Sequence, residues 1–365
     1  MALFFACFFA SAVLTLLVIR SGRRHAHLSA DDDLSGPQKF HARPVPRIGG
    51  VGIVLGVLLG ALGLWWETRG ETGPALGLWL LACGLPAFAA GLIEDLTKHV
   101  RPRWRLMATC FAAALAVWVL DATITRTDLW GLDWFASYPI GAAFLAIFVV
   151  AGIANAVNII DGFNGLASMC VVMMLLAIAY VADQVGDVTV TALALTGVSA
   201  VLGFFVWNFP AGLIFLGDGG AYFLGFYLAE LGILLLHRNP QVSPLFPLLL
   251  SIYPVFETLF SMYRRKVVRG RAASLPDGVH LHSLVYRRLL RWAVGSHDAK
   301  LLTRRNSMTA PYLWLLCMLA VVPSVIFWDD STMLGVCILI FGVAYVALYA
   351  MIVRFKVPTW LVSRR

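Results

Sequence analysis

The sequence predicts an all-α, polytopic membrane protein with about eleven transmembrane helices, its N-terminus outside and its C-terminus in the cytoplasm. Hydrophobic residues make up 60% of the 365 residues and charged residues only 13%, proportions that exclude an ordinary soluble domain. Most of the long apolar stretches are near the roughly 20 residues that a helix needs to cross about 30 Å of hydrocarbon. The stretches cover residues 2–20, 48–66, 74–93, 104–120, 138–154, 166–182, 188–207, 220–236, 244–262, 311–328 and 333–353.

Basic residues are confined almost entirely to every second connection. Of the 28 Lys and Arg residues, 25 lie in the regions 20–47, 94–105, 263–310 and 354–365. The other connections contain only Arg69, Arg126 and Arg238. Because basic residues are retained on the cytoplasmic side of a membrane, the four basic regions are expected to face the cytoplasm. This one-sided placement explains the net charge of +8 better than a nucleic-acid partner does.

The chain is expected to form one transmembrane domain over residues 1–365, with a motif-bearing core at 37–290 and terminal helices at 311–353. All six cysteines lie in apolar stretches without metal-ligand spacing, which favours small packed residues over a disulfide framework. The first apolar stretch is followed rather than preceded by basic residues. This is the reverse of the charge order in a signal peptide, so the stretch is expected to stay as a membrane helix.

The first basic connection has the residues of an anion-binding loop. Lys39, His41 and Arg47 are interleaved with prolines, and Gly49 and Gly50 open the next apolar stretch. Prolines favour an extended path, and glycines at a helix start let a phosphate approach free backbone amides. An ordinary positively charged cytoplasmic loop is the alternative that this segment alone leaves open.

The second basic connection begins with two adjacent acids. Glu94 and Asp95 end an apolar stretch, where ionisable residues are costly and usually functional. A structural cap is the alternative, but acids at a helix C-terminus oppose the helix dipole. We predict a catalytic role for both.

The connection between 154 and 166 is polar without any Lys or Arg. Asn155, Asn158 and Asp161 are three residues apart and share one face of a helix, and Gly162 and Gly165 are expected to end that helix. Polar backbone at membrane depth is tolerated around a protein-lined or watery cavity. Amide oxygens and a carboxylate suit Mg²⁺, although polar contacts between helices are the alternative.

Asp218 lies in a glycine-rich turn at the mouth of the next apolar stretch. A lone Asp at that place is usually a helix N-cap, and a metal ligand is the functional alternative. Phe215, three residues earlier, could stack on a base or simply pack.

The last basic connection contains a phosphate-attracting cluster that includes Arg264 and Arg265, followed by His280 and His282. The two histidines share a face only in an extended segment. They could bind zinc, but no Cys or third His is nearby, so hydrogen bonding to phosphate is favoured.

If the helices form a bundle, Glu94, Asp95, Asp161 and Asp218 share one cytoplasmic patch. Two unit charges 4 Å apart repel by about 4 kcal/mol at an effective dielectric constant near 20. Such a cluster needs a divalent cation, as does a bound diphosphate. The pattern therefore predicts metal-assisted phosphoryl transfer at a membrane surface.

Five motifs in order resemble the polyprenyl-phosphate N-acetylhexosamine-1-phosphate transferase superfamily, glycosyl transferase family 4. They are HARPVPRIGG, GLIEDL, NAVNIIDGFNGLA, FLGDGG and the basic loop that ends in PDGVHLHS. The PxPRxGG form and the HxH spacing are closer to the UDP-N-acetylglucosamine:undecaprenyl-phosphate branch than to the phospho-N-acetylmuramoyl-pentapeptide branch. The resemblance implies eleven helices and initiation of cell-surface polysaccharide, such as cell-wall or O-antigen, at the inner membrane of a bacterium.

The implied partners are a UDP-sugar donor, a polyprenyl phosphate acceptor and the membrane, with no nucleic acid; a homodimer stays open. The implied cofactor is Mg²⁺, with Mn²⁺ as an alternative, and the implied products are a polyprenyl-diphosphate sugar and UMP. A direct attack by the lipid phosphate is the simpler mechanism, and a covalent step through Asp218 is the other.

The resemblance also assigns residues. Asp218 is the implied metal ligand, with Asn158 beside it. Glu94, Asp95 and Asp161 fall on acidic positions of the motifs. The remaining implied substrate-binding residues are Lys39, His41, Arg47, Asn155, Phe215, Arg264, Arg265, His280 and His282.

The chain departs from the family pattern at four positions. Glu94 replaces an Asp, Asn164 replaces the second acid of DGxDG, Glu257 replaces an Asp common after the YP element, and Ser283 replaces a third histidine. None of these changes removes an implied metal ligand, so activity is expected. A transporter or flippase, and an inactive lipid-binding protein, are the competing hypotheses.

Overall fold

A computed structural model describes residues 1–29, 45–67, 72–268, 279–290 and 298–354. These parts of the chain are helical and contain no β-strand, which confirms the predicted all-α class. The long helices are α1 (Ala2–Ser29), α2 (Gly50–Glu67), α3 (Thr72–Thr97), α4 (Pro102–Leu120), α6 (Pro139–Ile160), α7 (Leu166–Gln184), α8 (Val188–Asn208), α9 (Gly217–Arg238), α14 (Ala310–Ile326) and α15 (Ser331–Val353). The short helices are α5 (Leu132–Ala136), α10 (Leu245–Leu250), α11 (Ile252–Tyr263), α12 (Leu281–Leu284) and α13 (Ala299–Ser307), with π-helical turns at Arg264–Val268 and Val285–Leu289.

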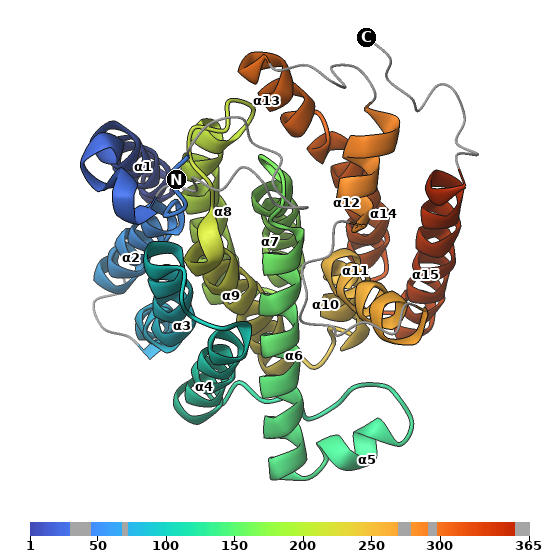
Figure 1. Cartoon of the computed structure of the whole chain (residues 1–365). Helices are drawn as coiled ribbons and strands as arrows, with labels where there is room; N and C mark the ends of the chain where they lie inside the picture. The colour runs from blue at the N-terminus through green and yellow to red at the C-terminus, as the bar shows by residue number, and fades with distance from the viewer. Residues whose placement is uncertain (30–44, 68–71, 269–278, 291–297, 355–365) are drawn as a thin grey trace.

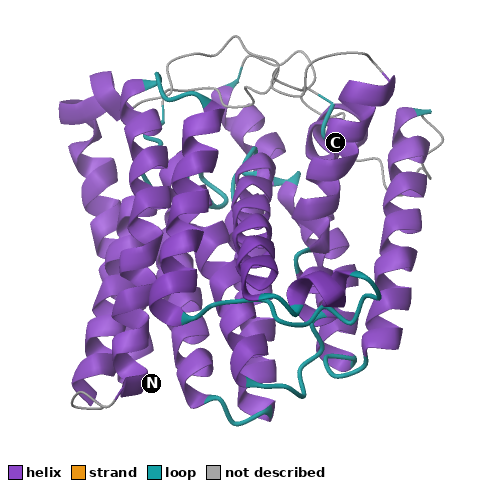
Figure 2. Cartoon of the chain, turned by 90° about the horizontal axis from the view of Figure 1, so that it is seen from below, coloured by secondary structure: helices purple, strands orange, loops and turns teal. Residues whose placement is uncertain are grey.

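Ten helical segments of the described chain are long and apolar enough to cross a membrane. The eleventh predicted crossing, 244–262, is not one helix but two, because α10 ends at Leu250 and α11 begins at Ile252. Pro254 explains the break: its ring clashes with the carbonyl group four residues earlier, which is that of Leu250, and it has no N–H to donate. Figure 2 shows the helices side by side in one bundle, as the prediction of a multi-pass membrane protein requires.

We call the end of the bundle where α2 and α9 begin, and where α3 and α6 stop, the motif end. The first turns of α1 lie at the other end, because Leu3 packs on Gly63 near the end of α2. The last turn of α15 lies at the motif end, where Arg288 donates to the carbonyl of Ile352 at 3.0 Å. Helix α1 therefore starts at one end of the bundle, and α15 finishes at the other.

Helix α9 is the central helix of the bundle. Every residue from Gly217 to Leu235 is buried, and the helix contacts α2, α3, α6 and α7 (Figure 1). A helix that is apolar all round has to be enclosed by other elements. Helix α9 is enclosed in this way, and its two acids, Asp218 and Glu230, are buried with it.

The N-terminal turn of α9 is held tightly between α2 and α3. A Cβ atom on Gly50 would lie 2.4 Å from the Cα of Gly220, and one on Gly91 would lie 2.5 Å from the amide nitrogen of Gly219. Glycines at these positions let three backbones approach more closely than any side chain would permit. The start of α9, and with it Asp218, therefore has very little freedom to shift.

The segment before α2 also contacts the start of α9 and the residues just before it. Phe215 donates its backbone N–H to the carbonyl of Pro46 at 2.8 Å, and the Gly49 amide donates to Phe215 at 3.0 Å. The Gly50 amide donates to the carbonyl of Leu216 at 3.0 Å. Two motifs that lie about 170 residues apart along the chain are thereby joined through their backbones.

Candidate active site

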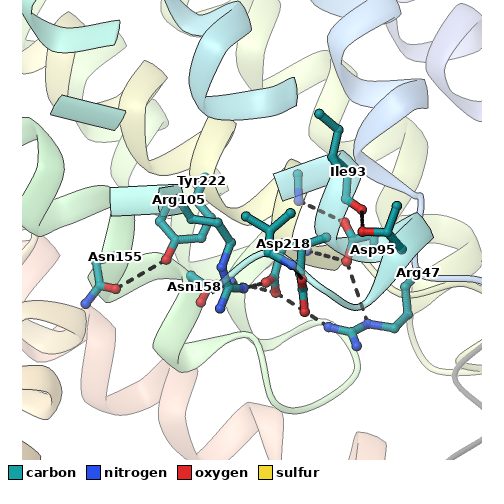
Figure 3. A network of polar contacts seen from close by, with 12 residues as sticks. Arg47, Ile93, Asp95, Arg105, Asn155, Asn158, Asp218 and Tyr222 are labelled. Carbon is teal, nitrogen blue, oxygen red and sulfur yellow. Dashed lines mark hydrogen bonds and ion pairs between the residues drawn. The ribbon is translucent and has the colours of Figure 1, made fainter. Parts of the chain in front are cut away.

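Five charged or polar side chains from five separate elements converge at the motif end (Figure 3). Asp218 is in the first turn of α9, Asp95 is near the end of α3, and Asn158 is near the end of α6. Arg105 comes from the first turns of α4, and Arg47 precedes α2. The sequence analysis predicted this convergence for all of them except Arg105.

Asp218 is at the centre of the group and is 8% exposed. Its Oδ1 accepts a hydrogen bond from the Asn158 side-chain amide at 3.0 Å and lies 3.5 Å from Nη2 of Arg47. Its Oδ2 is paired with Nη1 of Arg105. Two guanidinium groups thus face one carboxylate, which makes Asp218 the anionic focus of the site.

Asp95 is buried, and both of its carboxylate oxygens are occupied by the backbone of α9. Oδ1 accepts from the amide of Asp218 and Oδ2 from the amide of Gly219, each at 2.9 Å. The first amides of a helix have no partner within it, and the cap residue of α9, Leu216, has no side-chain acceptor. Asp95 therefore caps α9 from the neighbouring helix α3, and it holds Asp218 in place.

The usual N-cap alternative for Asp218 does not hold. Its carboxylate is directed at Asn158 and the two arginines, while Asp95 satisfies the free amides of the helix. Asp95 therefore caps α9, and within the described residues the Asp218 carboxylate takes part only in side-chain contacts with other elements.

Glu94 points away from its neighbour. Its Oε2 accepts from the backbone amide of Val100 at 2.6 Å, and it is half-buried. In the structure the Glu94 carboxylate closes the turn between α3 and α4. Its predicted catalytic role stays a prediction.

The polar stripe of α6 faces α9, as its spacing predicted. Asn155 accepts from the hydroxyl of Tyr222 at 3.4 Å, one helical turn beyond the pair formed by Asn158 and Asp218. The helix ends at Ile160, and α7 starts after Gly165, whose φ of +74° is readily adopted by glycine. The predicted break at the glycines is confirmed.

Asp161 follows directly after α6 and keeps part of its side chain exposed. Burial of the carboxyl raises its pKa to about 7, although the nearby positive charge of Arg47 acts to lower it. A carboxyl group whose pKa is raised in this way can keep its proton closer to neutral pH than a free Asp does.

Asn164, the residue at the second acidic position of the motif, is a structural residue here. It is 4% exposed, and its side-chain amide donates to the hydroxyl of Ser307 at 3.0 Å. Its backbone amide donates to the side chain of Asn306 at 2.9 Å. The change from Asp to Asn therefore supplies a donor that ties the loop between α6 and α7 to α13.

The two motif histidines lie side by side next to this same loop. The rings of His280 and His282 are stacked, with centroids 5.1 Å apart. His282 also lies against the ring of Phe163 at 5.5 Å, and a Cβ atom on Gly162 would be 3.2 Å from its Nε2. The histidine segment and the Asp161–Gly162 turn are thus adjacent.

The Arg264 side chain packs between α11 and α15, and its predicted role in substrate binding stays a prediction. It is 6% exposed, donates to the hydroxyl of Tyr349 at 2.6 Å and lies over the rings of Phe260 and Tyr349. Arg265 and Phe215 are partly exposed. Lys39 and His41 lie outside the described residues.

Arg105 is the site residue that sequence reasoning missed. It was counted only as a topological charge, yet it pairs with Asp218 and its guanidinium lies 5.8 Å from the centre of the Tyr222 ring. The sequence does contain a hint of this position. Pro102 is typical of the first turn of a helix, so Arg105 could have been placed at the start of a helix that follows the acidic pair after a short turn.

The donor set suits a magnesium ion shared with phosphate groups. The described part of the chain has no group of three or more His, Cys, Asp or Glu side chains placed to hold a metal by itself. Mg²⁺ is usually held by one or two carboxylates together with substrate phosphates and water. Asp218 with Asn158 provides such a partial set.

The chain is similar to known proteins over most of its length. The family model for glycosyl transferase family 4 matches residues 78–236. A probable undecaprenyl-phosphate N-acetylglucosaminyl 1-phosphate transferase of Bacillus subtilis (strain 168) is 30% identical, over 75% of this chain and 75% of its own length. The chain belongs to glycosyl transferase family 4. The resemblance drawn from the motifs is confirmed.

Two further relatives of this family 4 protein show how widely the similarity extends. A decaprenyl-phosphate N-acetylglucosaminephosphotransferase of Mycolicibacterium smegmatis is 30% identical, over 84% of this chain and 77% of its own length. A phospho-N-acetylmuramoyl-pentapeptide-transferase of Thermosynechococcus vestitus is 31% identical, over 73% and 68%. The region matched by the family model contains Asp95, Asn158 and Asp218 but not Arg47 or the histidines.

Proposed function

We propose that this family 4 transferase moves an N-acetylhexosamine-1-phosphate group from a UDP-sugar to a polyprenyl phosphate, with Mg²⁺, and releases UMP. The observation that carries the proposal is the convergence of Asp218, Asn158, Arg47 and Arg105 on one point at the end of a membrane bundle. Relatives named as transferases of this kind support it.

The two arginines are suited to hold the donor diphosphate. A guanidinium group binds phosphate through paired, charge-assisted hydrogen bonds. Within the described residues, Nε of Arg105 is buried and has no hydrogen-bond partner, so this group keeps a donor available for a phosphate oxygen. His280 and His282 are the predicted second contact for the diphosphate.

Asp218, with Asn158 beside it, would hold Mg²⁺. When bound, the ion would offset the negative charge of the diphosphate and of the surrounding acids. Asp95 keeps Asp218 in place by fixing the first turn of α9, so the metal-binding oxygen is positioned before substrate arrives.

The reaction is a direct displacement at phosphorus. An oxygen of the polyprenyl phosphate forms a bond to the sugar-bearing phosphorus of the donor. The bond from that phosphorus to the bridging oxygen breaks, and UMP leaves with the electron pair. The direct route needs no covalent enzyme intermediate, and Asp218 can act throughout as a ligand rather than as a nucleophile.

The test is release of UMP from a panel of UDP-N-acetylhexosamines, and from UDP-N-acetylmuramoyl-pentapeptide, with undecaprenyl phosphate and Mg²⁺ in detergent. Activity with one donor, lost on addition of EDTA and regained with Mg²⁺, is the expected result. Wild-type protein that is silent across the whole panel contradicts the proposal. Nucleotide or lipid binding without turnover would instead indicate an inactive binding protein, and lipid movement without UMP release a flippase.

We also propose that the motif end faces the cytoplasm of a bacterial inner membrane, because described residues of the basic connections, among them Arg47, Arg101 and Arg288, lie there. Arg101→Cys introduces an exposed thiol at the motif end, and Val188→Cys introduces one at the opposite end. In intact spheroplasts, a membrane-impermeant maleimide should label Val188→Cys and spare Arg101→Cys. The reverse labelling pattern contradicts this orientation.

A further inference from the structure

Glu257 is a buried acid that the proposed reaction does not use. It lies on α11, is 1% exposed, and accepts hydrogen bonds from two side chains and a backbone amide. Its Oε1 is 2.9 Å from Nδ1 of His280, and its Oε2 accepts from the hydroxyl of Tyr345 at 2.6 Å. The Leu281 amide donates to both oxygens, at 3.2 and 3.3 Å. A buried carboxylate with this many donors is held in one orientation.

The terminal helix α15 holds the histidine segment at a second point, one turn beyond Tyr345. The hydroxyl of Tyr349 donates to the carbonyl of Val279 at 3.3 Å and accepts from Arg264 at 2.6 Å. One tyrosine of α15, Tyr349, thus bonds to the segment that carries the motif histidines, and the other, Tyr345, bonds to the Glu257 carboxylate that contacts His280.

The other side of the segment is fixed by α13 and by the loop after α6. Arg305 donates to the carbonyls of Leu290 at 2.7 Å and Tyr286 at 2.8 Å. The ring of Tyr286 packs on Phe163 at 5.5 Å, and Phe163 in turn contacts His282. These contacts hold the histidine segment from two sides.

The contact to Glu257 also determines the chemistry of His280. An imidazole whose Nδ1 faces a carboxylate keeps its proton on that nitrogen, and Nε2 is then the nitrogen left for a ligand. The Gly162 turn next to the stacked His282 connects this pair of rings to Asp161. The orientation of His280 is therefore set by a group that cannot itself reach the diphosphate.

We propose that Glu257, Tyr345 and Tyr349 are positioning residues for His280 and His282, and that through them α15 sets the affinity for the UDP-sugar donor. The inference rests on the proposed function of the site. Under this proposal α15, which lies outside the region matched by the family model, contributes to donor binding.

Replacement of Glu257 by Gln distinguishes this role from simple packing. A Gln side chain has nearly the same volume but only one acceptor oxygen, and its amide NH₂ opposes a donor. A hydrogen bond to a charged group contributes enough that its loss is expected to raise the donor KM about tenfold or more. The kcat at saturating donor should change far less, because Asp218 and the arginines are untouched.

Three further variants test the same positioning role. Glu257→Asp keeps the charge on a shorter arm and should restore part of the donor affinity. Tyr345→Phe removes one hydroxyl from the pair, and Tyr349→Phe removes the contact with Val279; each should raise the donor KM by a few-fold. Glu67→Gln and Tyr180→Phe, which alter exposed residues of the same types, are the matched controls and should behave as wild type.

The experiment measures kcat and the donor KM by UMP release, UMP affinity by calorimetry, and the thermal midpoint of each variant. A raised donor KM and weakened UMP binding in Glu257→Gln and Tyr345→Phe, with the KM for polyprenyl phosphate unchanged, supports the inference. Folded variants with wild-type KM, or with a loss confined to kcat, overturn it. If Glu257→Gln does not fold, Tyr345→Phe decides on the same criteria. An inactive wild-type protein would refute the proposed function instead, so the two failures are distinct.

Discussion

Asp187 and Asp218 are both buried acids at the start of a long helix, and both pair with arginine, but they lie at opposite ends of the bundle. Asp187 caps its own helix, α8, by accepting from the amide of Val190 at 3.1 Å. It also accepts from Nε of Arg238 at 2.7 Å and from Asn239 at 3.1 Å. Its oxygens are fully used within the fold.

Asp218 does not cap its own helix, because Asp95 does so from α3. Its carboxylate is turned instead toward groups that arrive from three other elements, and one of them, Arg105, retains an unused buried donor within the described part of the chain. An acid that closes its own helix is structural. Asp218, whose helix is closed by another carboxylate, directs its oxygens at the side chains of Asn158, Arg47 and Arg105 and not at the backbone of its own helix.

The change with the largest expected effect is Asp218→Asn. It removes the anionic focus of the site, and loss of several kcal/mol of charge stabilisation lowers the rate by about 10³-fold or more. UMP release is the measurement, with Asp187→Asn as the matched control at the other end of the bundle. If Asp218→Asn kept an activity close to that of wild type, the proposed difference in role between Asp218 and Asp187 would be wrong.

Asp95→Asn should have the next largest effect, and it should affect stability as well as rate. An Asn side chain has one acceptor oxygen, so it can accept a hydrogen bond from only one of the two backbone amides that Asp95 binds. Its NH₂ group would face the other amide, which is also a donor. We expect about 10²-fold lower activity and a loss of about 1–3 kcal/mol in the free energy of unfolding. A comparable fall in rate with an unchanged thermal midpoint would mean that Asp95 acts on substrate directly and does not position Asp218.

Arg105→Gln should lower kcat/KM about tenfold, because one charge-assisted contact to the diphosphate is lost. Its matched control is Arg103→Gln, two residues earlier and exposed, which should leave turnover unchanged. Equal losses in the two variants would indicate a general effect of positive charge at this end of the bundle rather than a specific contact.

Asp187→Asn should leave turnover unchanged and reduce stability by about 1–3 kcal/mol at neutral pH. Burial alone would raise the pKa of Asp187, but hydrogen bonds from Arg238, Val190 and Asn239 outweigh it and hold the pKa below its usual value of 3.8. The stabilisation is therefore complete above the unfolded-state pKa and is lost as the pH falls through the lower folded-state pKa.

Thermal unfolding of wild type and Asp187→Asn from pH 7 down to pH 2 tests whether the pKa of Asp187 is lowered in the folded protein. The difference between the two thermal midpoints should be constant above about pH 5 and shrink below about pH 4. A difference that grows on acidification would contradict a lowered pKa for Asp187.

Local patterns were sufficient to predict the all-α bundle, whereas the roles given to the site residues came largely from the resemblance of the motifs and stay predictions. Apolar length and one-sided basic charge predicted the crossings, and the three-residue spacing of Asn155, Asn158 and Asp161 predicted a polar face at the end of a helix. The split at Ser251 was missed, although Pro254 signals it, because an average over an apolar stretch does not register a single missing N–H.

The sequence by itself determined which stretches are long and apolar enough to cross a membrane and which family the motifs resemble, since hydrophobic length, charge placement and residue type are local properties. Tertiary structure alone decided which acid does what. Asp95 and Asp218 are the same residue type, but contacts across 123 positions make Asp95 the cap of α9 and leave the Asp218 carboxylate facing Asn158 and the two arginines. Glu257 likewise takes its role from His280 and from a tyrosine 88 positions away, and hydrogen bonds between distant segments form only once the helices have packed.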